Sequence, residues 1–214
     1  MSQFFTVHPD NPQPRLMREA VKILRGGGVM AYPTDSCYAL GCMIGNKAGM
    51  ERIRAIRGVD ERHHFTLVCR DLSEIARYAR VDNRQYRFLK AATPGGYTFI
   101  LEATREVPRR LQHPKRSTIG LRVPDHPVVS FLLAEIDEPI LSMTLQLVGD
   151  AYAMNDPEDI RERIGNRVDL ILDAGFCLLD PTTVIDLTGE APELLRRGCG
   201  DLKRIGFTDQ SPWN

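Results

Sequence analysis

Short polar clusters interrupt the apolar stretches of this sequence, and their side chains are of the kinds that bind anions. The first cluster consists of Thr34, Asp35, Ser36 and Cys37. It follows a predicted buried strand at residues 29–32, and ligands of open α/β sheets usually bind beyond the carboxyl ends of strands. The alternative is a structural turn, in which Pro33 fixes the backbone and Asp35 or Ser36 caps it.

A second cluster is cationic and consists of Arg54, Arg57, Arg62, His63 and His64. Guanidinium groups keep their charge and present several donors, so these residues could hold phosphate. Asp60 and Glu61 lie among them, which leaves open a solvated loop that pairs its own charges. Adjacent histidines do not share a helix face, so the cluster does not predict a metal site.

A third cluster lies along a predicted strand at residues 117–123. Thr118, Gly120 and Arg122 alternate with apolar residues and therefore project from one face. An arginine in a buried strand is costly unless it finds an anionic partner. That partner is either a structural carboxylate or the carboxylate of a bound substrate, and the sequence leaves both open.

Two further strands carry hydroxyl groups and an amide, namely Ser142, Thr144, Gln146, Thr182 and Thr183. Threonine is a good strand former, so a purely structural role is also open for each of these runs. Arg196 adds a cation near the end of another strand. No Walker A motif, GxGxxG motif or nucleophile elbow is present. The clusters together indicate a site that binds an anionic ligand through hydroxyls and arginines.

The elements that must position these clusters alternate along the chain. Helical periodicity predicts helices at residues 14–25, 47–57, 82–92, 127–135 and 156–164 and another that begins at Asp71. Strands are predicted at residues 4–7, 29–32, 65–69, 97–103, 117–123, 140–145, 168–172, 183–187 and 193–197. The interleaving predicts a single α/β domain over residues 1–214, with its core at about 14–206 and a loosely held tail at 207–214.

Composition gives no sign of a membrane or disulfide-rich protein. The 28 Lys and Arg residues balance the 28 Asp and Glu residues, so the net charge offers no general attraction to nucleic acid. The five cysteines are widely spread without a CxxC pair, which suits reduced thiols. No uncharged run of about 18 residues occurs. We therefore expect a cytoplasmic protein that does not contact a membrane.

Read in order, six stretches of the sequence resemble motifs of the YrdC/YciO family. YPTDSCYALG is similar to the family's PTDTVYGLG, TPGGYTFIL to PGPLTLIL, and IGLRVPDHP to VAVRxPxHP. LSMTLQLVG is similar to STSANxSG, TTVIDLT to STVVDLT, and LLRRG to ILRPG. The resemblance runs from about Val21 to Gly200 and is closest to the YciO branch, whose NFTLMCRDL is similar to HFTLVCRDL here.

The resemblance implies a twisted, mostly parallel mixed sheet flanked by helices, with a concave positively charged surface. Members of the family form L-threonylcarbamoyladenylate from L-threonine, bicarbonate and ATP for the threonylcarbamoyladenosine modification of tRNA. The family thus implies a nucleotidyltransferase that uses ATP with Mg²⁺ as a substrate and needs neither a nucleophilic side chain nor a metal held by the protein. Its reported affinity for double-stranded RNA and tRNA implies an alternative, an RNA-binding paralogue without efficient synthase activity.

Site residues follow from the same resemblance. It implies L-threonine contacts at Thr34, Ser36, Arg122, Thr144 and Thr182, and ATP contacts at Arg57, His63, Thr118, Gln146 and Arg196. Candidate RNA phosphate contacts are Arg109, Arg110, Lys115 and Arg116. Several positions depart from the family. Val59 replaces a cation that binds phosphate, Val68 a histidine that helps hold threonine, and His63 and Gln146 each an asparagine.

Overall fold

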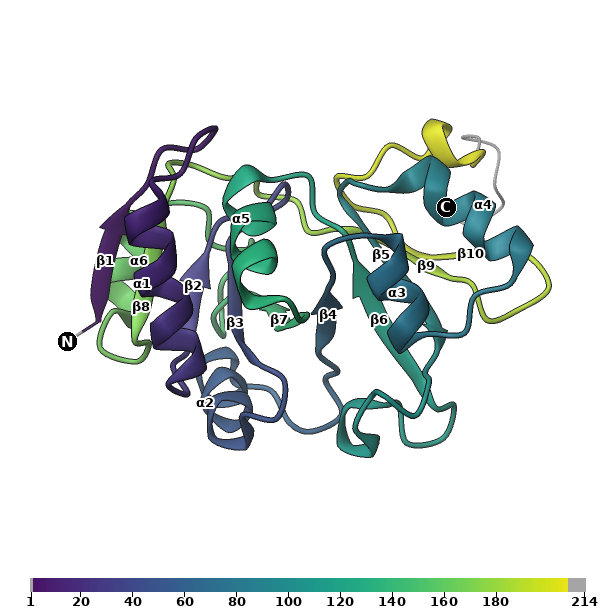
Figure 1. Cartoon of the computed structure of the whole chain (residues 1–214), viewed down its shortest axis with the longest axis horizontal. Helices are drawn as coiled ribbons and strands as arrows, with labels where there is room; N and C mark the ends of the chain where they lie inside the picture. The colour runs from purple at the N-terminus through teal and green to yellow at the C-terminus, as the bar shows by residue number, and fades with distance from the viewer. Residues whose placement is uncertain (1, 208–214) are drawn as a thin grey trace.

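The computed structural model describes residues 2–207, and these form a ten-stranded sheet flanked by helices (Figure 1). The strands are β1 (Gln3–Thr6), β2 (Met30–Tyr32), β3 (Ala39–Met43), β4 (Thr66–Val68), β5 (Tyr97–Glu102), β6 (Thr118–Arg122), β7 (Ile140–Thr144), β8 (Leu170–Asp173), β9 (Thr183–Asp186) and β10 (Glu193–Arg196). The helices are α1 (Pro14–Arg25), α2 (Lys47–Arg57), α3 (Leu72–Tyr78), α4 (Asn83–Ala92), α5 (Pro127–Ile136) and α6 (Pro157–Ile164), with 3-10 turns η1 (Arg109–Leu111) and η2 (Lys203–Ile205).

The sheet is mixed, as predicted, in the order β1-β8-β2-β3-β7-β4-β6-β5-β9-β10. Among the described strands, however, five neighbouring pairs are antiparallel and four are parallel, so the expectation of a mostly parallel sheet is corrected. The cause lies in the short connections. Only residues 33–38 join β2 to β3, whereas a parallel pair needs a crossover of about a dozen residues or more. Strand β3 therefore turns back antiparallel to β2 and also pairs antiparallel with β7.

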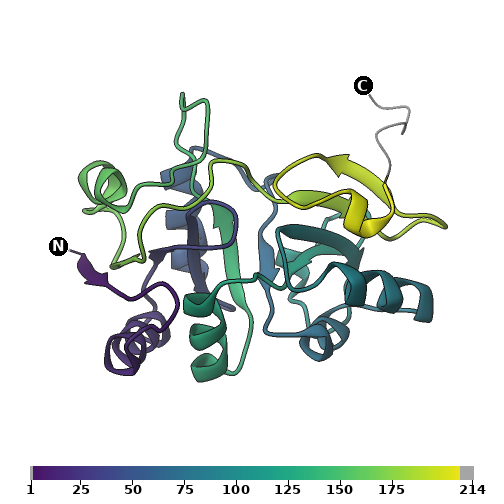
Figure 2. The same ribbon diagram turned by 90° about the horizontal axis from the view of Figure 1, so that it is seen from above.

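Alternation along the strands sends side chains to two hydrophobic clusters. Met30 and Tyr32 of β2 pack with α1 and α5, whereas Ala31 between them packs with α2 and α6. Figure 2 shows α1 and α5 together on one side of this half of the sheet, with α6 on the other. Both faces of β2 are therefore buried by helices, which is why its three residues are all apolar or aromatic.

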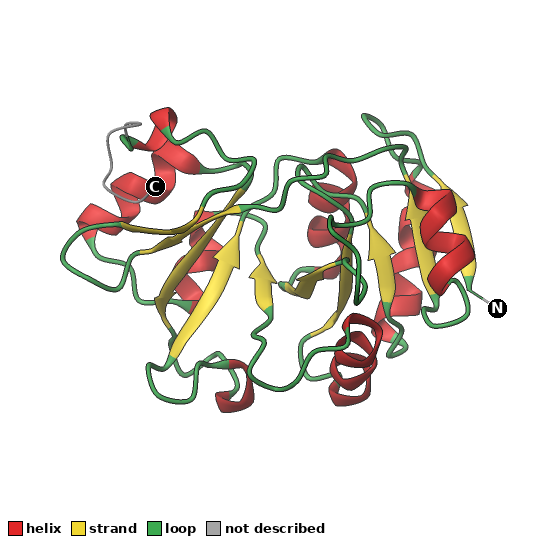
Figure 3. Cartoon of the chain, turned by 180° about the vertical axis from the view of Figure 1, so that it is seen from behind, coloured by secondary structure: helices red, strands yellow, loops and turns green. Residues whose placement is uncertain are grey.

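The other half of the sheet has one face without a helix. Phe99 of β5 and Leu121 of β6 belong to the larger hydrophobic cluster, together with residues of α3 and α4. Their neighbours Thr98 and Gly120 point the opposite way because side chains alternate along a strand. Seen from behind, β5 and β6 have no helix in front of them (Figure 3). This face is where polar side chains can surround a ligand.

Two further expectations concern the C-terminal tail and the membrane. Of the predicted loose tail at 207–214, only Phe207 belongs to the described residues, and it packs partly buried against the larger cluster. The remaining residues of that tail lie outside the described part. Within residues 2–207, every helix is too short or too polar to cross a membrane.

A histidine caps the N-terminus of α5. The Nδ1 atom of His126 accepts a hydrogen bond from the backbone N–H of Val128 at 3.3 Å, so this nitrogen is unprotonated. Burial lowers the pKa of His126 below its ordinary value. Between the lowered value and the ordinary value of about 6.5, the unfolded chain binds more protons than the folded chain. The free energy of unfolding therefore decreases as the pH falls through this window.

We expect the melting temperature to fall between pH 7 and pH 5, and His126→Asn to reduce that fall. Asparagine keeps an acceptor at the N-cap position but does not titrate. Thermal melting of both proteins at the two pH values measures the difference. The contribution of His126 would be refuted by an identical loss of stability in the variant and the parent.

Candidate functional site

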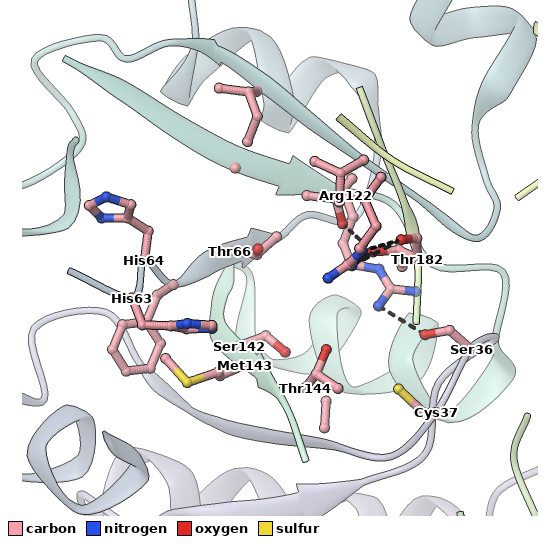
Figure 4. Close-up of a pocket in the computed structure, with 17 residues that line it drawn as sticks. Ser36, Cys37, His63, His64, Thr66, Arg122, Ser142, Met143, Thr144 and Thr182 are labelled. Carbon is pink, nitrogen blue, oxygen red and sulfur yellow. Dashed lines mark hydrogen bonds between the residues drawn. The ribbon is translucent and has the colours of Figure 1, made fainter. Parts of the chain in front are cut away.

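Strand register places small polar residues side by side on the open face. Thr66 of β4 pairs with Ser142 of β7 on one side and with Gly120 of β6 on the other. Residues two positions along a strand share a face, so Thr144 and Arg122 belong to the same polar surface. Figure 4 shows these side chains around a common space.

That space is a cavity of about 170 Å³. Its polar lining consists of Ser36, His63, His64, Thr66, Thr98, Arg122, Ser142, Thr144, Thr182 and Arg196. Among the described residues that line it, two are arginines and none is an aspartate or glutamate. Pockets for drug-sized ligands usually measure about 300–1,000 Å³, so this smaller cavity suits a small anionic molecule, and a nucleotide would extend beyond it.

Six of the ten ligand contacts predicted from the sequence line this one cavity. They are Ser36, His63, Arg122, Thr144, Thr182 and Arg196. These residues come from segments as far apart as the connection after β2 and the last strand, β10. The fold therefore brings together four of the five predicted threonine contacts and two of the five predicted nucleotide contacts, whose individual roles remain predictions.

Thr34 is not one of the described residues that line the cavity. Its hydroxyl donates to the carbonyl oxygen of Cys37 at 2.7 Å and accepts from the backbone N–H of Ser36 at 3.1 Å. The Oγ atoms of Thr34 and Ser36 are also 3.0 Å apart. Thr34 thus holds the turn that presents Ser36, and the turn anticipated for this segment is stabilised by Thr34 itself.

Three predicted ATP contacts lie outside the cavity lining. The Arg57 guanidinium donates to the main-chain oxygen of Gln146, and the Gln146 side chain donates to the carbonyl of Asp150 at 2.9 Å. These two hydrogen bonds therefore stabilise the segment that follows β7. Thr118 begins β6, four residues before Arg122, and lines a separate surface cavity with Arg80.

Arg122 has a structural carboxylate partner and also unused donors. Its guanidinium pairs with Asp35, whose other oxygen accepts from the backbone N–H of Asp125 at 2.9 Å. Its Nη1 lies 3.4 Å from the Ser36 hydroxyl, and its Nε is buried without a hydrogen-bond partner. Asp35 offsets the cost of burying the arginine. Arg122 also lines the cavity, so it is a candidate to bind the anionic group of a ligand as well.

A chain of hydrogen bonds positions Arg196 and Thr182. The Arg196 Nη2 donates to the carbonyl of Thr182 at 2.9 Å, and the Thr182 and Thr98 hydroxyls are 2.8 Å apart. Burial lowers the pKa of Arg196, but a guanidinium keeps its charge in proteins. Burial, and then the charge of Arg57, lowers the pKa of His63 below its ordinary value. His63 is therefore a neutral hydrogen-bonding group at neutral pH.

Two of the four candidate RNA contacts, Arg109 and Arg110, line a second cavity, and Lys115 and Arg116 do not. Arg109 and Arg110 line it together with Arg54, Arg62 and His64, and His64 also borders the first cavity. Two carboxylates, Glu51 and Glu61, interrupt this lining. Arg116 instead lies 3.6 Å from the buried carboxylate of Asp186.

Comparison with known proteins identifies the family to which the chain belongs. A family model for Sua5, YciO and YrdC proteins, described as "Telomere recombination", matches residues 22–198. The chain belongs to the Sua5/YciO/YrdC family. An uncharacterised protein of Haemophilus influenzae is 57% identical over 201 residues, which are 94% of this chain and 97% of that protein. YciO of Escherichia coli K12 is 55% identical over 203 residues, 95% of this chain and 98% of its own.

More distant members of the Sua5/YciO/YrdC family include an enzyme. A threonylcarbamoyl-AMP synthase of Halorhodospira halophila is 30% identical over 191 residues, 88% of this chain and 98% of its own.

Two solved structures share the fold of this chain. The crystal structure of E. coli YciO matches with a TM-score of 0.92 and 54% identity, over 96% of this chain and 100% of that chain. P. abyssi Sua5 complexed with L-threonine matches with a TM-score of 0.84 and 24% identity, over 92% and 58%, and so shares the fold.

Gly120 offers a test of the cavity that leaves its hydrogen bonds in place. A Cβ at this position would lie 3.2 Å from the Thr66 Oγ1 and 3.5 Å from the Thr98 Cγ2, so a larger side chain would enter the space between them. We expect Gly120→Val to weaken binding of any ligand in the cavity about tenfold or more, while valine's strand propensity preserves folding. Ligand titration together with thermal melting checks this. Unchanged affinity in a folded variant would show that the ligand binds elsewhere.

Proposed function

We propose that this protein is a threonylcarbamoyl-AMP synthase-like enzyme that forms L-threonylcarbamoyladenylate from L-threonine, bicarbonate and ATP. The observation that carries the proposal is one cavity lined by two arginines and several hydroxyls, with no carboxylate among its described lining residues. The synthase relative at 30% identity and the threonine complex of P. abyssi Sua5 support it. The product would serve tRNA modification in the cytoplasm.

In the proposed complex, Arg122 binds the threonine carboxylate. Asp35 holds the guanidinium in place, and Ser36 lies beside its Nη1. Thr144 and Thr182 add hydroxyls from two other segments of the cavity wall. Hydrogen bonds between ionised groups are directional and about twice as strong as neutral ones, so this clamp fixes the amino acid relative to the nucleotide.

The absence of carboxylates from the described cavity lining suits the first chemical step. Bicarbonate first takes up a proton and loses water to give CO₂. A neutral amine then attacks the carbon of CO₂, so that an N–C bond forms as one C=O π bond breaks, and the nitrogen loses a proton to solvent. A nearby carboxylate would stabilise the ammonium form, whereas Arg122 and Arg196 destabilise it. The two cations also stabilise the resulting carbamate anion. The cavity thereby favours both the reactive amine and its product.

In the second step a carbamate oxygen attacks the α-phosphorus of ATP. The new P–O bond forms as the bond from the α-phosphorus to the bridging oxygen breaks, and pyrophosphate leaves with that electron pair. We assign the binding of phosphate or ribose oxygens to Arg196 and His63, which line the cavity, and Thr118 lies further along the same face of β6 as Arg122. Catalysis of this kind depends on positioning and charge neutralisation, so no nucleophilic side chain is needed.

Mg²⁺ would enter as part of the nucleotide substrate. Among the described residues, no group of three or more His, Cys, Asp or Glu side chains is arranged to hold a metal ion. Oxygen ligands suit Mg²⁺, and substrate phosphates and waters commonly provide most of them. The chain's contribution at the phosphates would therefore be its cations.

Departures from the family indicate a slower enzyme. Val68 is fully buried, packs in the cluster of α1 and α5, and provides no imidazole for threonine. Val59 packs against the larger cluster where the family has a cation. Each charge-assisted contact contributes about 1.5–3 kcal/mol, so losing two of them would reduce the rate roughly 10²- to 10⁴-fold.

The test is incorporation of labelled bicarbonate into an acid-labile adenylate in the presence of Mg²⁺, ATP and each of the twenty amino acids. The proposal expects product with L-threonine and release of one pyrophosphate for each adenylate. Product with a different amino acid would move the assignment to that substrate. No product with any amino acid, from a folded protein that binds ATP, would refute the synthase assignment.

The second candidate function is RNA binding at the second cavity. Its support is the cationic lining formed by Arg54, Arg62, Arg109 and Arg110. If the protein binds RNA there, its affinity for duplex RNA should decrease steeply as the salt concentration rises. The affinity should also be lower in an Arg109→Ala, Arg110→Ala variant than in the parent protein. Arg122→Ala should leave that affinity unchanged. RNA affinity that responds to neither salt nor the two arginines would refute it.

A further inference from the structure

A buried tyrosine donates a hydrogen bond to one of the hydroxyls that line the cavity. The Tyr32 hydroxyl donates to the Ser142 Oγ at 2.7 Å. Tyr32 is fully buried in the cluster that contains α1 and α5, and it does not belong to the described cavity lining, whereas Ser142 does. The pair therefore connects the hydrophobic core to the ligand cavity through one hydrogen bond.

Gly41 provides the space for this connection. Gly41 lies on β3 and pairs directly with Ser142 on β7. A Cβ built on Gly41 would be 2.9 Å from the Tyr32 Cε1 and 3.0 Å from the Ile140 Cγ2, which is closer than Cβ atoms normally approach their neighbours. Only glycine lets the Tyr32 ring lie across β3 and reach Ser142 on the next strand.

The geometry also determines which way the Ser142 proton points. The Tyr32 hydroxyl is the donor in this 2.7 Å bond, and burial raises its pKa to about 12, so the phenol keeps its proton at neutral pH. A serine hydroxyl that accepts this bond keeps one proton of its own to donate. Within the described part of the chain the Ser142 hydroxyl has no other hydrogen-bond partner, and Figure 4 shows it at the cavity. The proton is thus available to a ligand.

We propose that Tyr32 is a positioning residue that fixes Ser142 as a hydrogen-bond donor to an anionic oxygen of the bound ligand. The identity of that ligand rests on the function proposed above, in which the oxygen belongs to the carboxylate or carbamate of threonine. A donor oriented before the ligand arrives does not have to be immobilised on binding. The contribution of Tyr32 to binding acts entirely through Ser142.

The experiment compares Tyr32→Phe, Ser142→Ala and the double variant with the parent protein by calorimetric titration, using L-threonine and, separately, Mg²⁺ with ATP. We expect each single variant to weaken binding of the same ligand roughly 10- to 100-fold. The double variant should bind no more weakly than Ser142→Ala. Tyr38→Phe is the matched control, because Tyr38 is equally buried but donates to the carbonyl of Gly175 at 2.9 Å. We expect its ligand affinity to be unchanged.

Parental affinity in Tyr32→Phe, or a double variant whose loss is the product of the two single losses, overturns the inference. A parent protein that binds ATP but not threonine overturns the proposed function alone, and the ATP titrations then decide the role of Tyr32. A readout without ligand comes from crystal structures of the parent and Tyr32→Phe. The inference expects the Ser142 hydroxyl to change rotamer when the phenol is removed, and an identical rotamer in both structures overturns it.

Discussion

Arg122→Ala should lower kcat/KM for threonine-dependent pyrophosphate release by about 100-fold or more. The substitution removes the clamp proposed for the substrate carboxylate, and charge-assisted hydrogen bonds contribute about 1.5–3 kcal/mol each. It also leaves the carboxylate of Asp35 buried beside an empty space, since both side chains of this pair are nearly inaccessible to solvent. Breaking a buried pair in this way costs about 3–5 kcal/mol of stability. Initial rates and denaturant unfolding measure the two effects.

A second substitution separates lost folding from lost binding. Asp35→Ala in the Arg122→Ala background removes the unpaired carboxylate and should recover much of the stability without recovering activity. The outcome that contradicts a substrate-binding role for Arg122 is recovery of both quantities together in the double variant. In that case Arg122 would serve only to neutralise Asp35, which is the structural alternative left open by the sequence.

Arg196→Ala should raise the KM for ATP roughly 10- to 100-fold while changing the KM for threonine much less. The expectation rests on the assignment of Arg196 as a nucleotide contact, because it lines the same cavity as His63, the other predicted nucleotide contact there. Its guanidinium also binds the carbonyl of Thr182, so a modest effect on threonine is expected. Steady-state kinetics with each substrate varied in turn measures the two constants.

Arg105→Ala is the control for Arg196→Ala, because Arg105 is exposed and is not a described lining residue of the cavity. Its kinetic constants should equal those of the parent protein. An equal rise of both KM values in Arg196→Ala would contradict a nucleotide-specific role. It would indicate that the arginine supports the shape of the whole cavity through Thr182.

Most of the secondary structure could be predicted because its signals are local. The apolar spacing of residues 14–25 and 47–57 predicted α1 and α2 with the bounds that the structure has. Strand β3 was missed because ALGCM is a short apolar run with an internal glycine, without the alternation that marks a strand. Its pairing with β2 and β7 is set by tertiary contacts, which are absent from local sequence.

The types of residue that line the cavity could be predicted from the sequence, but the strand pairing that brings them together could not. Residue type and motif order identified Ser36, Arg122, Thr144, Thr182 and Arg196, which do share a cavity. The same motifs also proposed Gln146 and Thr118, which lie outside its lining. Ser142 was noted as a polar strand residue but not assigned to a ligand, and Thr66 and Thr98 were not selected, because a threonine or serine in a strand gives no local sign of the residue that lies across from it. Only strand pairing reveals that they meet.

The central claim is that one cavity holds an amino-acid carboxylate next to a nucleoside phosphate. A crystal structure of the protein with L-threonine and a non-hydrolysable ATP analogue tests it most directly. We predict the threonine carboxylate against Arg122, with the α-phosphate of the analogue in the same cavity near Arg196. Threonine bound elsewhere on the protein, or the two ligands in separate cavities, would contradict the claim.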